Sequence, residues 1–200
     1  MKLPIVFAAL AFGSQVLAQA TPSGSPSEIA PPQEQIASAV LPLPADLRAS
    51  ATVLGYGADG KLTTLRSGTG GMICLASDPR GSLFHVACYH KSMEPFMARG
   101  RELRAQGVRG DNVDSVRFRE ARSGTLAMPD KPAVLYSLTG TKGSYDPATN
   151  AIANARALYV VYIPYATPES TGLSAVPVQG APWIMFPGTP KAHIMFIAKM

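Results

Sequence analysis

Two cysteines, Cys74 and Cys88, place the strongest constraint on what this 200-residue chain can fold into, because it has no others. Each lies in a short run rich in apolar and β-branched residues, at 72–75 and 83–89, and the turn-forming sequence Asp-Pro-Arg-Gly at 78–81 separates the runs. The pattern predicts a β-hairpin whose strands a disulfide can join. Loop-closure entropy suggests that such a bridge removes roughly 3 kcal/mol of conformational freedom from the unfolded chain.

The first twenty residues have the parts of a cleavable signal peptide. Lys2 lies in a short basic region, an apolar run covers residues 5–17, and the small-residue triplet Ala-Gln-Ala follows at 18–20. The apolar run is shorter than the roughly 20 residues that a membrane-spanning helix needs, and a polar stretch follows it at once. We therefore expect an exported mature chain without a membrane span, periplasmic or secreted, in a compartment where disulfides form.

The remaining sequence predicts one domain. Residues 21–35 are rich in Pro, Ser and Gly and are expected to form a disordered leader. Residues 36–200 are long enough to bury one sizeable core, and a content of 16% charged residues over the whole chain is not that of a disordered polymer.

Hydrophobic periodicity and turn residues predict both helices and strands. We expect helices over residues 34–40, 93–106 and 113–122, and strands over residues 51–56, 61–66, 72–75, 83–89, 133–138, 158–163 and 193–197. The run at 158–163 is almost continuously apolar, which is typical of a central strand covered on both faces. These elements predict an α+β domain with an antiparallel or mixed sheet and about two helices packed on one side.

Arginines gather in the two longer predicted helices. The cluster contains Arg99, Arg101, Arg104, Arg109, Arg117, Arg119 and Arg122, interspersed with Glu102, Asp111, Asp114 and Glu120. One interpretation is two solvated helix faces with ion pairs between them. The other is a face that binds a small anionic ligand. Nucleic acid is not expected as a partner, because the chain is predicted to be exported and aromatic residues hardly interleave with the arginines.

A metal site is an alternative interpretation of the cysteines. His85 and His90 lie beside Cys74 and Cys88, but the order Cys, ten residues, His, two residues, Cys, one residue, His matches zinc-ligand spacing poorly. In an exported chain with two cysteines, the structural disulfide is the preferred hypothesis.

His90 forms a second hypothesis, because it lies where a predicted strand meets a predicted helix. Glu94 follows one turn later, and His193 begins the last predicted strand. His90 and Glu94 could act as a base and its orienting group, or they could bind zinc or copper in an open site completed by His193, with Met93 or Met97 as soft copper ligands. The alternative is that Glu94 only complements the helix N-terminus and that His90 caps the helix.

Trp183 is the one tryptophan of the chain. It could line a ligand pocket with Tyr165, or it could be a buried anchor, as tryptophans more often are.

Three segments also carry a resemblance: GTGGMIC at 68–74, CYHKS at 88–92 and PGTPKAHIM at 187–195. Together they resemble a group of exported bacterial proteins of unknown function. The resemblance implies export and implies that His90 and His193 belong to one site; it implies no activity.

Two classes of function follow from the residues. The first is an exported ligand-binding or interaction module that has a structural disulfide and needs no cofactor. The second is a small exported metal-binding protein or metal-assisted hydrolase that uses His90, Glu94 and His193.

Overall fold

The computed structural model describes residues 29–177 and 180–197, so the predicted signal peptide and most of the predicted leader lie outside the described residues. Along the chain the elements are α1 (Pro32–Ala39), α2 (Ala45–Arg48), β1 (Thr52–Tyr56), β2 (Leu62–Arg66), β3 (Met72–Leu75), β4 (Leu83–His90), a 3₁₀ turn (Lys91–Met93), α3 (Glu94–Ala105), α4 (Asp111–Arg122), β5 (Ala133–Thr141), β6 (Tyr145–Asp146), β7 (Ala151–Ile152), β8 (Arg156–Tyr162), α5 (Pro168–Thr171), β9 (Trp183–Met185) and β10 (His193–Ile197).

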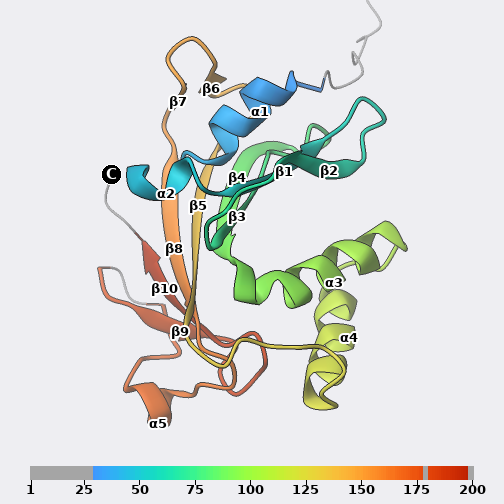
Figure 1. Cartoon of the computed structure of the whole chain (residues 1–200). Coiled ribbons are helices and arrows are strands. Elements are labelled where there is room, and N and C mark those ends of the chain that lie inside the picture. The colour runs from blue at the N-terminus through green and yellow to red at the C-terminus, as the bar shows by residue number, and fades with distance from the viewer. Residues whose placement is uncertain (1–28, 178–179, 198–200) are drawn as a thin grey trace, which may run out of the picture.

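Eight strands form one mixed sheet in the order β2-β1-β3-β4-β5-β8-β10-β9, and β6 pairs with β7 in a separate hairpin (Figure 1). Only the β1–β3 pair is parallel, and the other pairs of the large sheet are antiparallel. The α+β class and the mixed sheet predicted from the sequence are therefore confirmed.

The predicted cysteine hairpin is also present. Strands β3 and β4 pair antiparallel, and the register places Cys74 directly opposite Cys88. The two residues form a disulfide and are both fully buried.

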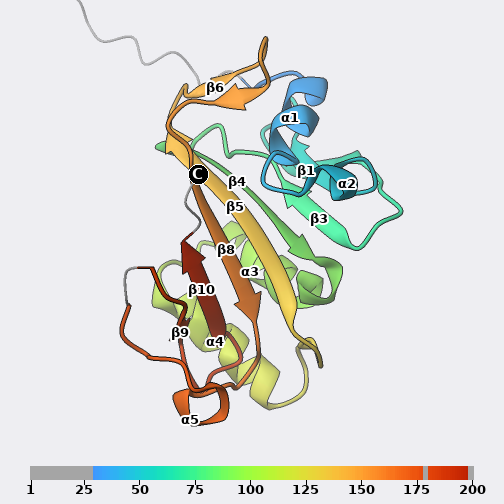
Figure 2. The same ribbon diagram turned by 90° about the vertical axis from the view of Figure 1, so that its left-hand side faces the viewer.

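Helices α3 and α4 pack on one face of the sheet, as predicted, and lie behind it in Figure 2. Phe96 and Met93 are fully buried there against Tyr89, Val160 and Tyr162 of the strands. The sequence did not predict that α1 and α2 pack on the opposite face, where Ala39, Leu43, Val53 and both cysteines form a second core.

The predicted leader boundary at residue 35 is wrong. Helix α1 begins at Pro32, because proline suits the first turn of a helix. Gln35 is buried: its Nε2 donates to the carbonyl oxygens of Ala30 (2.7 Å) and Tyr56 (2.9 Å), and its Oε1 accepts the N–H of Tyr56 (2.8 Å). The two bonds to Tyr56 attach α1 to β1 and the third holds Ala30, so residues 30–35 belong to the folded domain.

Within residues 29–177 and 180–197, no helix is both long enough and apolar enough to cross a bilayer.

Candidate functional site

His90 is the last residue of β4 and caps the 3₁₀ turn that follows. Its Nδ1 accepts the N–H of Ser92 (3.3 Å) and lies 2.9 Å from Ser92 Oγ. The capping role considered from the sequence is therefore confirmed.

Glu94 is bonded to two other side chains rather than to His90. Tyr89 Oη donates to Glu94 Oε2 (2.5 Å), Arg101 Nη2 donates to Glu94 Oε1 (2.6 Å), and Arg101 Nη1 donates to Tyr89 Oη (2.9 Å). Burial, and then the bond to Glu94, raise the pKa of Tyr89 well above its usual value, so this phenol stays protonated. The three groups form a closed network that holds α3 against β4.

His193 is buried at the start of β10, with its ring near those of Tyr162 (centroids 5.1 Å apart) and Phe186 (5.7 Å). Its Nδ1 lies 2.7 Å from the carbonyl oxygen of Lys191, which can only accept, so Nδ1 carries the proton. Burial lowers the pKa of His193 more than the bond to this carbonyl raises it. The ring is therefore neutral at pH 7.

The predicted convergence of His90 with His193 does not occur. In the register, Tyr89 pairs with Leu135, Leu135 with Val160, and Val160 with Met195, so these residues share one face. His193 lies on that face with Met195, whereas His90 follows Tyr89 and lies on the other.

The two histidines are also three strand spacings apart, roughly 14 Å. Among the residues that the structure describes, no group of three or more His, Cys, Asp and Glu side chains could hold a metal ion. The geometry gives no support to a site made of His90, Glu94 and His193.

Trp183 and Tyr165 do not form the predicted pocket. Trp183 is buried on β9 and its Nε1 has no hydrogen-bond partner, whereas Tyr165 is exposed in the segment before α5. Neither residue lines the two cavities described next.

These two cavities flank the tip of the β3–β4 hairpin, and no motif in the sequence predicted them. One, of about 240 Å³, has Glu34, Lys142 and Tyr145 in its wall. The other, of about 330 Å³, has Tyr56 and His85 in its wall. Their sizes are at or below the lower end of typical small-ligand sites, about 300–1,000 Å³. Asp78 of the turn at 78–81 lines both cavities.

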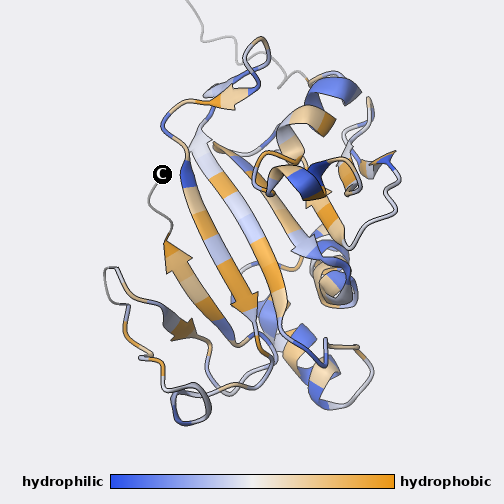
Figure 3. Ribbon diagram, turned by 60° about the vertical axis from the view of Figure 1, so that its left-hand side comes forward, coloured by the Kyte–Doolittle hydropathy of each residue, from blue (hydrophilic) through white to orange (hydrophobic). Residues whose placement is uncertain are grey.

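Among the described residues, no helix covers one part of the sheet on the face that carries α1 and α2. Figure 3 shows β5, β8 and β10 with no helix in front of them and with apolar residues along all three strands. The register sets six side chains there in two rows of three, and we call this set the open face: Val134, Val161 and Ile194 in one row, Tyr136, Tyr159 and Phe196 in the other.

The aromatic row of the open face is the more accessible. Tyr159 is 37% exposed and Phe196 is 38% exposed, and Tyr136 contacts Tyr159 edge to face with centroids 5.5 Å apart. None of the six side chains carries a charge. Helices α1 and α2 border the open face on the β4 side, where Val134 and Tyr136 pack against their core.

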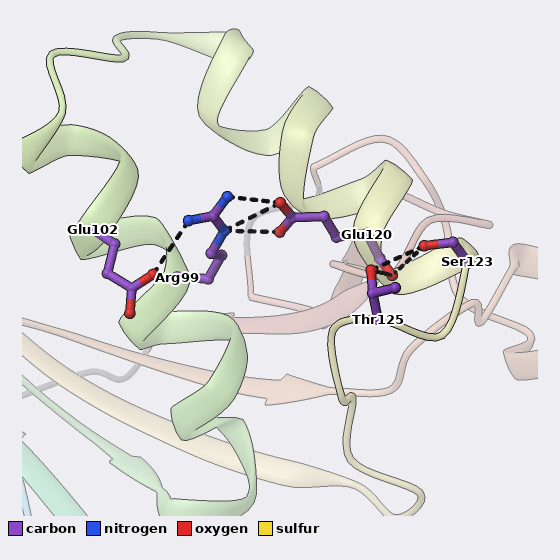
Figure 4. Close-up of polar contacts among 5 residues, drawn as sticks. All are labelled: Arg99, Glu102, Glu120, Ser123 and Thr125. Atoms are coloured by element: carbon purple, nitrogen blue, oxygen red, sulfur yellow. Dashed lines mark hydrogen bonds and ion pairs between the residues drawn. The ribbon is translucent and has the colours of Figure 1, made fainter.

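The arginine-rich helices contain the ion pairs expected from one interpretation of the sequence. Arg99 of α3 donates from Nε and Nη2 to Glu120 of α4 (2.9 and 2.7 Å) and from Nη1 to Glu102 (3.2 Å). Figure 4 shows this cross-link, together with Ser123 and Thr125, whose hydroxyl groups donate to the backbone carbonyl oxygen of Glu120.

Not every arginine is paired in this way. Arg117 is almost completely buried and bonds to Asp114, and Asp114 also accepts from Lys191 Nζ (2.8 Å). Of the seven arginines in this cluster, four have no carboxylate within ion-pair distance among the described residues: Arg104, Arg109, Arg119 and Arg122. The helices therefore keep a local excess of positive charge.

Comparison with known proteins adds no assignment: no protein-family model, characterised protein or solved structure matches this chain.

Proposed function

We propose that this protein is an exported, non-catalytic interaction module, and that the open face is its binding surface. The observation that carries the proposal is the aromatic row Tyr136, Tyr159 and Phe196, which crosses three neighbouring strands and in which Tyr159 and Phe196 are exposed. Tyrosine and phenylalanine are enriched at protein interfaces, and a contiguous exposed apolar patch marks an interaction site more often than scattered apolar residues do.

The chemistry of the open face favours a second copy of the same chain as the occupant. The surface has no charged side chain, so an identical surface would bury no unpaired charge. The row is also self-complementary: it has Tyr159 on the central strand and an aromatic residue on each outer strand. A two-fold axis along β8 would oppose Tyr159 with its own copy and set aromatic groups together at both sides.

The size of the open face limits how tightly two copies of the chain can associate. Three strands cover a width of roughly 14 Å, which provides the core of a small interface rather than of an obligate dimer. We therefore expect reversible association with a dissociation constant in the micromolar range or weaker. The net charge of the chain, +5 in full and +4 without the predicted signal peptide that contains Lys2, opposes association, so added salt should tighten it by screening that repulsion.

Sedimentation velocity from about 1 to 500 μM protein, at low and high salt, tests the proposal. The wild type should show a concentration-dependent dimer, strengthened by salt, and both Tyr159→Lys and Phe196→Lys should remain monomeric. Leu83→Lys is the matched control, because Leu83 is 48% exposed at the hairpin tip, away from the open face. A wild type that is monomeric throughout, or a dimer that both variants retain, would refute self-association through this face.

Circular dichroism checks that the two lysine variants of the open face remain folded. Both test positions are more than one-third exposed, so lysine at either should leave the spectrum and the cooperative thermal transition in place.

A further inference from the structure

The α3–α4 pair contains a second feature, which is independent of the open face. Gly100 lies in the middle of α3, where the position of an added side-chain carbon is 2.8 Å from Arg117 Nη1 and 3.2 Å from Arg104 Nη1. The two Nη1 atoms therefore lie no more than about 6 Å apart. A side chain at residue 100 would collide with the Arg117 guanidinium, so glycine is what allows these groups to meet.

The charges near this point do not balance. Arg104, Arg117 and Lys191 supply three positive charges, and Asp114, which binds both Arg117 and Lys191, supplies the one carboxylate bonded to them. Among the described residues, Arg104 is hydrogen-bonded to no acid, because Glu94, Glu102 and Glu120 are occupied by other arginines. Two positive charges remain uncompensated.

The two guanidinium groups differ in burial: that of Arg117 is buried and fixed, whereas that of Arg104 is exposed. Arg117 is 5% exposed, stacks over the ring of Phe96 at 3.9 Å, and donates from Nη1 to the carbonyl oxygen of Phe96 (3.1 Å), so it is held in place. Arg104 is exposed and can adjust. Partial desolvation, followed by the charge of Arg117, lowers the pKa of Arg104, which shows that the two cations repel each other.

We propose that Arg104 and Arg117 bind one phosphate-class dianion, a free phosphomonoester or inorganic phosphate, between their guanidinium groups. An oxyanion that accepts two N–H···O bonds of about 2.9 Å can bridge donor nitrogens up to roughly 6 Å apart, and the two Nη1 atoms lie within that limit. Two guanidinium groups bind phosphate in charge-assisted pairs, and a dianion matches the local excess of two positive charges.

Isothermal titration calorimetry with inorganic phosphate, at constant ionic strength set by chloride, tests the site. Arg104→Gln removes the exposed member of the pair and leaves the buried Arg117 in place, so the fold should persist. We expect phosphate to bind the wild type at least about tenfold more tightly than R104Q, as the loss of a charge-assisted hydrogen bond requires.

Arg122→Gln is the matched control. Arg122 lies on α4, stacks over Phe118 and bonds to no carboxylate among the described residues, so R122Q removes the same charge from the same pair of helices. It should retain the wild-type affinity. Equal affinity for wild type and R104Q, an equal loss in R104Q and R122Q, or no heat of binding with the wild type would each overturn the proposal.

Two further titrations identify the source of the phosphate group. Glycerol 3-phosphate represents a free monoester, and vesicles with phosphatidic acid represent a lipid headgroup. Binding of either that is lost in R104Q supports the site and identifies the source, and binding of either that R104Q retains overturns it. Acetate, a monoanion, should bind at least about tenfold more weakly than phosphate; equal binding would refute the match to two charges.

Discussion

Asp114 should be the most important single carboxylate for the stability of this fold. It bonds to Arg117 of its own helix and to Lys191, 77 residues further along the chain, and so connects α4 to the segment before β10. Asp114→Asn would leave Arg117, a 5% exposed cation, with no carboxylate partner. Leaving a buried charge uncompensated typically costs about 3–5 kcal/mol.

Two details reduce the expected loss of stability in D114N below that range. The side chains of Asp114 and Lys191 are 21% and 23% exposed, so water screens part of the interaction, and asparagine retains one oxygen that can accept from Arg117. We therefore expect the free energy of unfolding at pH 7 to fall by about 2–4 kcal/mol. For a domain of this size that corresponds to roughly 4–16 °C in melting temperature.

The pH dependence of this loss identifies its cause. Burial acts to raise the pKa of Asp114, but hydrogen bonds from Lys191 and Arg117 outweigh it and hold the pKa below its usual value. A carboxyl with a lowered pKa stabilises the fold fully above its unfolded pKa of about 3.9, and this contribution disappears as pH falls through the folded pKa. The difference between wild type and D114N should thus be constant from pH 7 to 5 and should shrink below about pH 4.

Urea denaturation at pH 7, 5 and 3 measures this difference. Asp111→Asn is the matched control, because Asp111 lies in the same first turn of α4 and has no ion pair within the described residues. It should lose less than about 1 kcal/mol, the usual value of a helix-dipole interaction. The reasoning fails if D114N is no less stable than D111N at pH 7, or if its deficit is the same at pH 3.

Two further predictions concern the other face of the sheet. Replacing both Cys74 and Cys88 by alanine should remove about 3 kcal/mol of loop-closure stabilisation and lower the melting temperature by roughly 6–12 °C. Differential scanning calorimetry would show it, and a shift below about 2 °C would mean that the bridge does not stabilise the fold. Gln35→Ala deletes three hydrogen bonds between α1 and its surroundings and should cost about 2–3 kcal/mol in urea denaturation, at the sum of typical single bonds. A loss under about 0.5 kcal/mol would show that packing alone attaches α1.

Local sequence signals predicted much of the fold, because the responsible residues are close together in the chain. The cysteine hairpin depends on two neighbouring strands and one turn, and α3 and α4 follow from the spacing of their apolar residues. The predicted last strand, 193–197, agrees with β10 in both bounds. The position of α1 was less accessible, because prolines at 31 and 32 suggested a leader and the bonds of Gln35 reach a strand twenty-one residues away.

The candidate site was predicted less well, because it depends on the order of the strands. His90 and His193 both begin or end a strand, but whether they meet depends on which strands separate β4 from β10 and on which face each residue takes. Neither property can be read from local periodicity, and a change of one residue in register would exchange the faces. The open face was missed for a related reason: the sequence shows that 158–163 is apolar, but not that one side of it lacks a covering helix.

The two proposed surfaces lie on opposite faces of the sheet, and this separates their effects. The open face is on the side of α1 and α2, whereas Arg104 and Arg117 belong to helices that pack on the other side. A packed sheet and a helix layer lie between them, roughly 10 Å for the spacing of such layers alone. Perturbations that are this far apart and share no partner are usually additive. Phosphate affinity that changes in Tyr159→Lys would therefore mean that association and anion binding are coupled, and unchanged affinity would show two independent sites on one domain.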